Sequence, residues 1–200
     1  MEYKMTNWDY ALIVYISLAL LTFMPTLWAI LKKVNLNPDG DGYDQSPFFD
    51  EKQKERLKQH YSRIAGTLGY WKNHSEKYRR FKNYSIVWSI TISIVIPVIS
   101  QGIGEGTSNW FLTVISTHAA LLLAFHKGFK VDQNYQAFRT AESEFFDLRR
   151  ELLDNPTKFG AESEIQIDAF FRQVSKFRRM ARQAEIDNVA SINSINNNNT

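Results

Sequence analysis

The 200-residue sequence contains no cysteine. This absence excludes a disulfide framework and removes thiolates as metal ligands or nucleophiles. The chain also lacks an HExxH zinc motif, a glycine-rich phosphate loop that follows a strand, and an acidic pair or Ser-His-Asp arrangement suited to catalysis. We therefore expect no enzymatic activity, no bound metal and no cofactor.

The chain also has no large excess of positive or negative charge. The net charge is only +3, and basic residues are mixed with acidic ones along the sequence. Such a distribution gives no support for a nucleic-acid partner. Apolar residues, in contrast, are concentrated in three runs between charged stretches. We therefore expect one membrane unit with a cytosolic helical part, and not two independent globular domains.

Two of the apolar runs, 86–99 and 110–125, are separated by a short segment without lysine or arginine. Each run reaches about 20 residues with its flanks, which is long enough for a helix to cross the hydrocarbon core. The segment between them, 101–109, contains three glycines and one acid, which is typical of a tight turn. We predict a transmembrane hairpin at 84–129, although a globular chain also buries helices of this length.

The third apolar run, Ala11–Leu31, predicts an N-terminal transmembrane helix at 8–33. A cleaved signal peptide is the competing interpretation. It is disfavoured because the run is long, the pair Lys32-Lys33 comes after it, and no small-x-small cleavage site follows. Aromatic residues that favour a membrane interface lie near both ends: Trp8, Tyr10 and Trp28.

Basic residues are distributed unequally around the three predicted spans. Of the 24 lysines and arginines, 12 lie in 32–82 and 11 follow Phe125, whereas the N-terminal tail has only Lys4. Cytoplasmic segments of membrane proteins are enriched in these residues. We therefore predict that both large polar parts are cytoplasmic and that the N-terminus and the hairpin turn lie outside. Three spans satisfy this alternation, whereas two or four do not.

The polar parts are predicted to form a loop at 34–49, where turn signals follow one another, and then long helices. A helix starting at Asp50 is expected to continue into the second span, giving about 80 Å of nearly unbroken helix over 50–103. The third span is expected to continue in the same way as far as Asn155-Pro156, and a shorter helix follows from about Glu162. Apolar side chains recur at helical spacing in these segments: Leu57, Ile64, Leu68, Phe138, Phe145, Leu152, Ile167, Phe170 and Val174.

The predicted fold is therefore an all-α membrane protein with three transmembrane helices. The last two form a hairpin that extends into a cytosolic, coiled-coil-like helical bundle, and the whole of this domain covers 50–187. Cytosolic helices occupy 130–187, after the hairpin. A tail at 188–200, rich in serine and asparagine, is predicted to be disordered.

Small and hydroxyl-bearing residues recur on one face of each hairpin helix. On the second span these are Ser85, Ser89 and Ser93; on the third they are Thr113, Ser116, Thr117 and Ala120. Small residues allow membrane helices to approach closely, and hydroxyl groups form hydrogen bonds between them. The alternative interpretation is that these faces line a water-filled path in an oligomer, and the sequence does not separate the two.

His118 is the one ionisable residue well inside a predicted span. Ionisable groups in the membrane are functional candidates because they usually face a bundle interior or a cavity. A neutral histidine, hydrogen-bonded to a serine or carbonyl of a neighbouring helix, is the alternative.

A group of basic residues is predicted to lie at the inner membrane interface. We call it the basic collar, and it comprises Arg79, Arg80, Lys82, Lys127 and Lys130. Anionic lipid headgroups attract such residues by about 1 kcal/mol per charge. The lipid bilayer is therefore the expected partner of the collar.

Several stretches together resemble a known family: Gly69-Tyr70-Trp71, Arg79-Arg80-Phe81, Ile94-Val95-Ile96-Pro97-Val98 and Asn134-Tyr135-Gln136-Ala137-Phe138-Arg139. They resemble the SLATT-type two-transmembrane domains of bacteria, in particular a subfamily of unknown function. The resemblance covers about 57–154, and the additional span at 11–31 departs from the two-span pattern.

The resemblance implies an effector of a bacterial conflict or antiphage system in the inner membrane. Such an effector is expected to form homo-oligomers that make or gate a pore when a nucleotide-signalling partner protein is activated, and the family has no catalytic residues to carry over. The alternative hypothesis is a membrane-anchored scaffold or adaptor whose cytosolic helices bind a protein partner.

Overall fold

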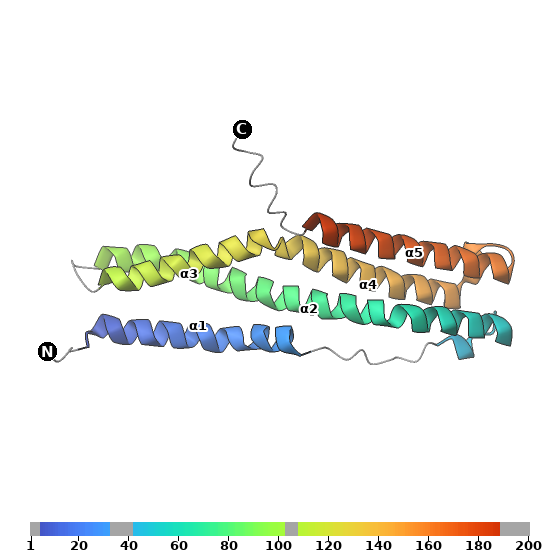
Figure 1. The fold of residues 1–200 in the computed structure, drawn as a ribbon, viewed down its shortest axis with the longest axis horizontal. Coiled ribbons are helices and arrows are strands. Elements are labelled where there is room, and N and C mark those ends of the chain that lie inside the picture. The colour runs from blue at the N-terminus through green and yellow to red at the C-terminus, as the bar shows by residue number, and fades with distance from the viewer. Residues whose placement is uncertain (1–4, 33–41, 103–107, 189–200) are drawn as a thin grey trace, which may run out of the picture. The chain divides into compact units, whose positions relative to one another are not determined.

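A computed structural model describes residues 5–32, 42–102 and 108–188. These ranges form five α-helices and two short 3-10 helices, without a strand (Figure 1). The helices are α1 (Asn7–Leu31), α2 (Glu51–Gly102), α3 (Ser108–Gly128), α4 (Val131–Asp154) and α5 (Ser163–Asn188), with η1 at Tyr43–Gln45 and η2 at Pro156–Phe159. The prediction of an all-α chain is confirmed. Three helices, α1, α2 and α3, are long and apolar enough to span a membrane.

The starts of α1 and α2 are fixed by side-chain caps. The Thr6 hydroxyl accepts a hydrogen bond from the amide of Asp9, whose carboxylate accepts one from the amide of Thr6. Asp50 and Gln53 form the same reciprocal pair ahead of α2. The predicted helix start at Asp50 and the continuous helix into the second apolar run are both confirmed, since α2 is 52 residues long and includes Pro97.

The prediction that the third span continues without a break into the next helix is wrong. Helix α3 ends at Gly128, and the amide of Lys130 bonds to the carbonyl of Lys127 at 3.0 Å. Lys130 has a left-handed φ of 43°, so the chain turns before α4 begins at Val131. Glycine lowers helix stability by about 1 kcal/mol relative to alanine, which favours termination at this point.

The predicted loop at 34–49 contains η1 and several buried side chains. Tyr43 is fully buried and Phe49 is 4% exposed, so this end of the loop packs against the helices. The first part of the loop, the hairpin turn at 103–107 and the predicted disordered tail from 189 lie outside the described residues. The predicted stop at Asn155-Pro156 is confirmed, since α4 ends at Asp154.

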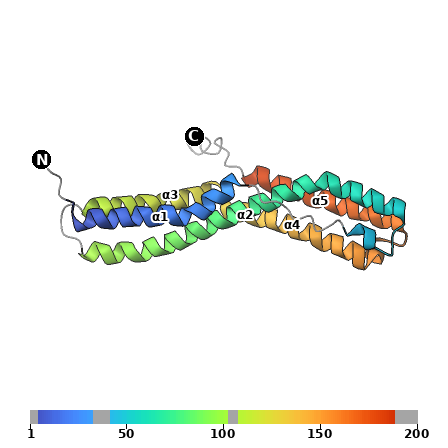
Figure 2. The ribbon, with the colours of Figure 1, turned by 90° about the horizontal axis from the view of Figure 1, so that it is seen from below.

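The chain divides into two compact units, and α2 belongs to both. The apolar unit contains α1, the part of α2 from Lys77 onward, and α3, and it ends at Asp132. The polar unit contains the part of α2 up to Glu76, together with α4, α5 and both 3-10 helices. Within the apolar unit, α1, α3 and the C-terminal part of α2 lie side by side (Figures 1 and 2).

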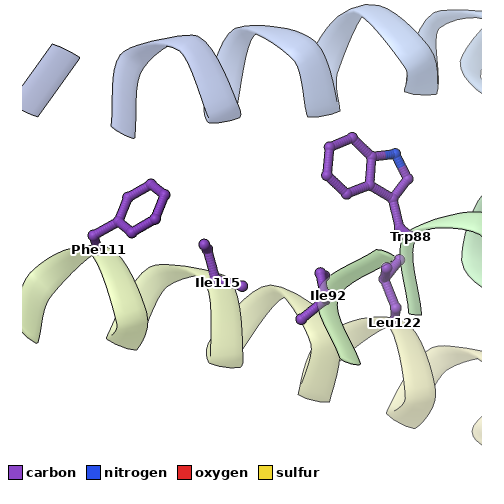
Figure 3. Packing of buried hydrophobic residues seen from close by; sticks show 5 residues of the cluster. All are labelled: Trp88, Ile92, Phe111, Ile115 and Leu122. Carbon is purple, nitrogen blue, oxygen red and sulfur yellow. The ribbon is translucent and has the colours of Figure 1, made fainter. Parts of the chain in front are cut away.

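Each unit has its own apolar core. In the apolar unit the buried residues are Trp88, Ile92, Phe111, Ile115 and Leu122, and the rings of Phe111 and Trp88 point toward α1 (Figure 3). In the polar unit the predicted stripes of α2, α4 and α5 are buried, with at most 2% exposure for Leu57, Ile64, Leu68, Phe138, Phe145, Leu152, Ile167, Phe170 and Val174. The predicted apolar spacing therefore marks the faces that form the core.

Gly66 offers a direct test of helix stability in the polar unit. It is exposed within α2, and a Cβ atom added there would meet nothing within 4 Å. We expect Gly66→Ala to raise the free energy of unfolding by about 1 kcal/mol, because alanine loses less backbone entropy in a helix. Denaturant unfolding of the purified protein, followed by circular dichroism, measures this change. Gly128→Ala at the end of α3 is the control and should gain less; equal stability of Gly66→Ala and wild type would contradict the expectation.

Candidate functional site

His118 on α3 connects all three helices of the apolar unit. Its ring atom Nδ1 lies 2.6 Å from the hydroxyl oxygen of Tyr15 on α1, and Nε2 lies 3.2 Å from the hydroxyl oxygen of Tyr84 on α2. The side chain is half-buried. Both ring nitrogens therefore have hydroxyl partners, and the partners come from helices that are far apart in the sequence.

The proton positions in this network follow from a third contact. The Tyr84 hydroxyl donates to the carbonyl of Ala19 at 3.3 Å. Its oxygen can then accept from Nε2–H of His118, which leaves Nδ1 to accept from the Tyr15 hydroxyl. A neutral histidine with its proton on Nε2, assigned from this geometry, satisfies every group in the network. The histidine partners are tyrosine hydroxyls, whereas a serine or carbonyl was expected.

Trp88 extends the network along α1. Its Nε1 donates to the hydroxyl of Thr22 at 2.9 Å, and its ring lies 5.4 Å from that of His118. Tyr15 packs edge-on against the same indole, with ring centroids 5.3 Å apart and an interplanar angle of 85°. Edge-to-face aromatic pairs contribute about 0.5–1.5 kcal/mol beyond their buried area. The polar atoms are thus held inside an aromatic cage.

A groove of about 310 Å³ adjoins this cage. Residues of α1, α2 and α3 line it, and apart from His118, Tyr15 and Tyr84 their side chains are aliphatic or phenylalanine. The groove therefore presents an apolar surface with one polar cluster. This combination suits an acyl chain or an apolar helix side chain better than a charged solute.

The residues of the predicted serine face of α2 become more exposed along the helix. Ser85 is 3% exposed, and its hydroxyl has no hydrogen-bond partner among the described residues. Ser89 is half-buried, and exposed Ser93 donates its hydroxyl proton to the Ser89 carbonyl at 2.7 Å. Burial of this face therefore decreases along α2 from Ser85 to Ser93.

The predicted small-residue face of α3 lies on the surface of the apolar unit. Its exposed members are Thr113, Ser116, Thr117 and Ala120. The opposite side of the helix carries the buried Phe111, Ile115 and Leu122. The two predicted faces therefore do not meet in one copy of the chain, and His118 is joined to tyrosines and not to either set.

An acid that was not predicted from the sequence, Asp132, pairs with the basic collar. Lys82 Nζ lies 2.8 Å from one carboxylate oxygen of Asp132, and His126 Nε2 lies 2.9 Å from the other. Arg80 donates to the carbonyl of Pro25 at 3.4 Å. Arg79 and Lys127 are exposed, and Lys130 is half-buried at the turn after α3. The collar thus combines cations exposed at the surface with one lysine, Lys82, that pairs with Asp132.

Asp132 provides a pH test of the collar. Hydrogen bonds from Lys82 and then His126 lower the pKa of Asp132 below its ordinary value of 3.8. Because the folded-state pKa is depressed, the stabilisation is present above about pH 4 and is lost as the pH falls through the lowered value. We expect Asp132→Asn to cost under about 1 kcal/mol at pH 6, since the group is exposed, and less at pH 3. Unfolding free energies of both proteins across this range measure it; an equal cost at both pH values would contradict the pairing.

The residues missed in the sequence belong to the apolar runs themselves. Tyr15 and Tyr84 carry hydroxyl groups, and Trp88 carries an N–H, in or next to the predominantly apolar runs. Buried tyrosine and tryptophan usually find hydrogen-bond partners. These residues could have been identified from the sequence by asking which side chains of the apolar runs could form a hydrogen bond with His118.

A scan against protein-family models, a search of curated proteins and a search of solved structures each found no match to this chain. The resemblance to SLATT-type domains therefore depends on the sequence stretches alone. The functional argument has to start from the geometry of the two units.

Proposed function

We propose that the chain is a membrane protein whose copies associate through α3 and form or gate a pore. The proposal is based on the small-residue face of α3. This face is exposed, and it lies on a helix that is otherwise mostly apolar. Interfaces between membrane helices are enriched in small residues because these allow the backbones to approach closely. A second copy is therefore the partner that this face fits best.

The remaining contacts of α3 support this assignment. Its other side is already occupied within one copy, by the packing of Phe111 and Ile115 and by the hydrogen bonds of His118. Ser116 and Thr117 donate no side-chain hydrogen bond within the described part of the chain, so both hydroxyls are available to a neighbouring helix or to water. In an oligomer this face serves helix packing, pore lining or both.

We further propose the bacterial inner membrane as the location, with the N-terminus outside and the polar unit in the cytoplasm as a helical bundle. The distribution of lysine and arginine supports this orientation. The SLATT resemblance supports an effector role in antiphage defence, triggered through a nucleotide-signalling partner protein. Helix α2 runs without interruption from the polar unit into the apolar unit, and it is the proposed path of the trigger.

Vesicle leakage tests the pore proposal. Purified protein is reconstituted into liposomes loaded with a self-quenching dye, and the membrane potential is followed in bacterial cells that express it. We expect leakage and depolarisation, and we expect Ser116→Leu and Ala120→Leu to reduce both by about tenfold while lowering the fraction of cross-linked oligomer. Val98→Leu, on an exposed site of α2, is the matched control. No leakage with any candidate activator, together with an intact membrane potential in the cells, would exclude the pore.

A scaffold or adaptor is the second candidate, and one observation favours it. Helix α5 exposes three large apolar side chains in the polar unit: Ile165 at 48%, Met180 at 57% and Ile186 at 60%. Apolar side chains of this size at a surface suit a protein partner. A scaffold predicts that Ser116→Leu leaves function intact whereas Met180→Glu abolishes it; the pore hypothesis predicts the reverse. Cellular activity of the two variants, at matched expression levels, separates the hypotheses.

A further inference from the structure

The polar unit contains a groove between α2 and α5 in which positive charge is concentrated. Its volume is about 280 Å³. Helix α2 contributes Gly66, Thr67 and Tyr70 to its walls, and α5 contributes Arg178, Arg182 and Glu185. All of these residues belong to one compact unit.

Within the described part of the chain neither arginine of the groove is ion-paired, although a carboxylate also lines the groove. Both are exposed, and neither forms an ion pair with any residue that the structure describes. The carboxylate of the groove, Glu185, accepts a hydrogen bond from the Tyr70 hydroxyl at 2.5 Å. Arg56, elsewhere on α2, differs in this respect, because Glu164 and Asp168 hold it at 2.5 and 2.7 Å. Ion pairing within the unit therefore accounts for Arg56 but not for Arg178 or Arg182.

A third guanidinium group adds to the field beside the groove. Burial first, and then the charges of Arg178 and Arg63, lower the pKa of His60. Arg178 and Arg63 thus both act on His60. A phosphate group is well suited to such a site, because it accepts the paired N–H donors of arginine in a fixed geometry.

The groove also has room for a ligand. Gly66 leaves open space, since a Cβ atom there would meet nothing within 4 Å. Tyr70 is 38% exposed at the same wall, and the neighbouring Thr67 carries a hydroxyl group. An anion bound by the arginines therefore has an aromatic side chain and a hydroxyl group beside it.

We propose that this groove binds a phosphate-bearing anion, with Arg178 and Arg182 contacting the phosphate oxygens and Tyr70 lining the remainder of the ligand. The phosphate belongs either to a soluble phosphorylated compound or to a phospholipid headgroup, which share this chemistry. The site does not depend on the proposed pore, because a scaffold can carry it equally well.

Titration with inorganic pyrophosphate tests the site. Full-length protein in a neutral detergent is studied by calorimetry and by NMR of the histidine ring signals. We expect saturable binding with a Kd below about 1 mM. Arg178→Gln and Arg182→Gln should each weaken it about tenfold or more, because each removes a charge-assisted contact. Binding should also raise the pKa of His60, since the anion offsets the charge of Arg178.

Two further variants distinguish a defined site from general attraction. Arg172→Gln removes an exposed charge from the same helix outside the groove and should change the Kd less than about twofold. Gly66→Leu keeps every charge, replaces glycine by a better helix former and fills the open space, so it should abolish binding without lowering the melting temperature. Equal weakening by Arg172→Gln and Arg178→Gln, or full binding by Gly66→Leu, would overturn the proposal.

The source of the phosphate is resolved with vesicles. Reconstituted protein is compared in zwitterionic and anionic liposomes, with protection of Arg178 and Arg182 from a guanidinium-modifying reagent as the measurement. Protection in anionic liposomes alone, lost in Gly66→Leu, indicates a headgroup, whereas protection by pyrophosphate in zwitterionic liposomes indicates a soluble ligand. If neither pyrophosphate nor anionic lipid protects the arginines, the groove is not a phosphate site.

Discussion

Replacing His118 by leucine is expected to destabilise the apolar unit by about 2–4 kcal/mol. The substitution removes two hydrogen bonds between helices, each of which contributes about 1 kcal/mol in a membrane protein. It also leaves the Tyr15 hydroxyl without its acceptor and the Tyr84 oxygen without its donor, and an unsatisfied buried group costs about 1–3 kcal/mol. Unfolding of the purified protein in mixed micelles, followed by tryptophan fluorescence, measures the loss.

A matched control and a double-mutant cycle make this prediction specific. Leu123→Ala, at an exposed site of the same helix, should change the free energy of unfolding by less than about 0.5 kcal/mol. The pair Tyr15→Phe and His118→Leu should show a coupling energy of about 1 kcal/mol, because each single change removes the same bond. Wild-type stability of His118→Leu would show that the network is not formed in the folded protein.

Replacing Leu68 by aspartate is expected to unfold the polar unit, with a loss of more than about 4 kcal/mol. Leu68 is fully buried in α2, so the carboxylate would be placed in the core without a partner. Hydrogen exchange is the measurement, and protection should be lost across α4 and α5. Ser62→Asp, at an exposed position of the same helix, should retain it. Native protection in Leu68→Asp would mean that the core is not packed as described.

This second prediction also limits which variants can separate the functional hypotheses. A charge at Leu68 or at Phe145, which is 1% exposed, removes the fold of the unit along with any binding surface. Loss of activity would then follow under both the pore and the scaffold hypothesis. Substitutions at exposed positions, such as Met180 and Ser116, are the ones that discriminate.

The helices could be predicted because their signals are local. Apolar side chains at helical spacing mark the cores of α2, α4 and α5, and Asp50 and Pro156 mark ends that the structure confirms. The break after Gly128 was missed because Lys130 adopts a left-handed conformation that non-glycine residues seldom have. Helical spacing continues across this turn, so periodicity alone does not detect it.

The candidate site was less predictable, because its contacts depend on how whole helices rotate and slide. His118 was identified as an ionisable group in an apolar run, but Tyr15 lies 103 residues away in the sequence. Hydropathy is insensitive to rotation about the helix axis, so it does not reveal that Ser85 is inside and Thr117 outside. Asp132 was missed for a related reason, since the collar was defined by positive charge alone.

Helix α1 has a single register against its neighbours, although about half of its side chains are aliphatic groups that do not fix a register. Its polar contacts involve Tyr15, the carbonyl of Ala19 and the hydroxyl of Thr22, which are spaced by four and three residues on one side of the helix. A slip of one residue moves the helix about 1.5 Å along its axis and turns it by about 100°, which would break all three together. Helix α1 is therefore held at one axial position beside α2 and α3, and extending its apolar run by a residue at either end should leave that position unchanged.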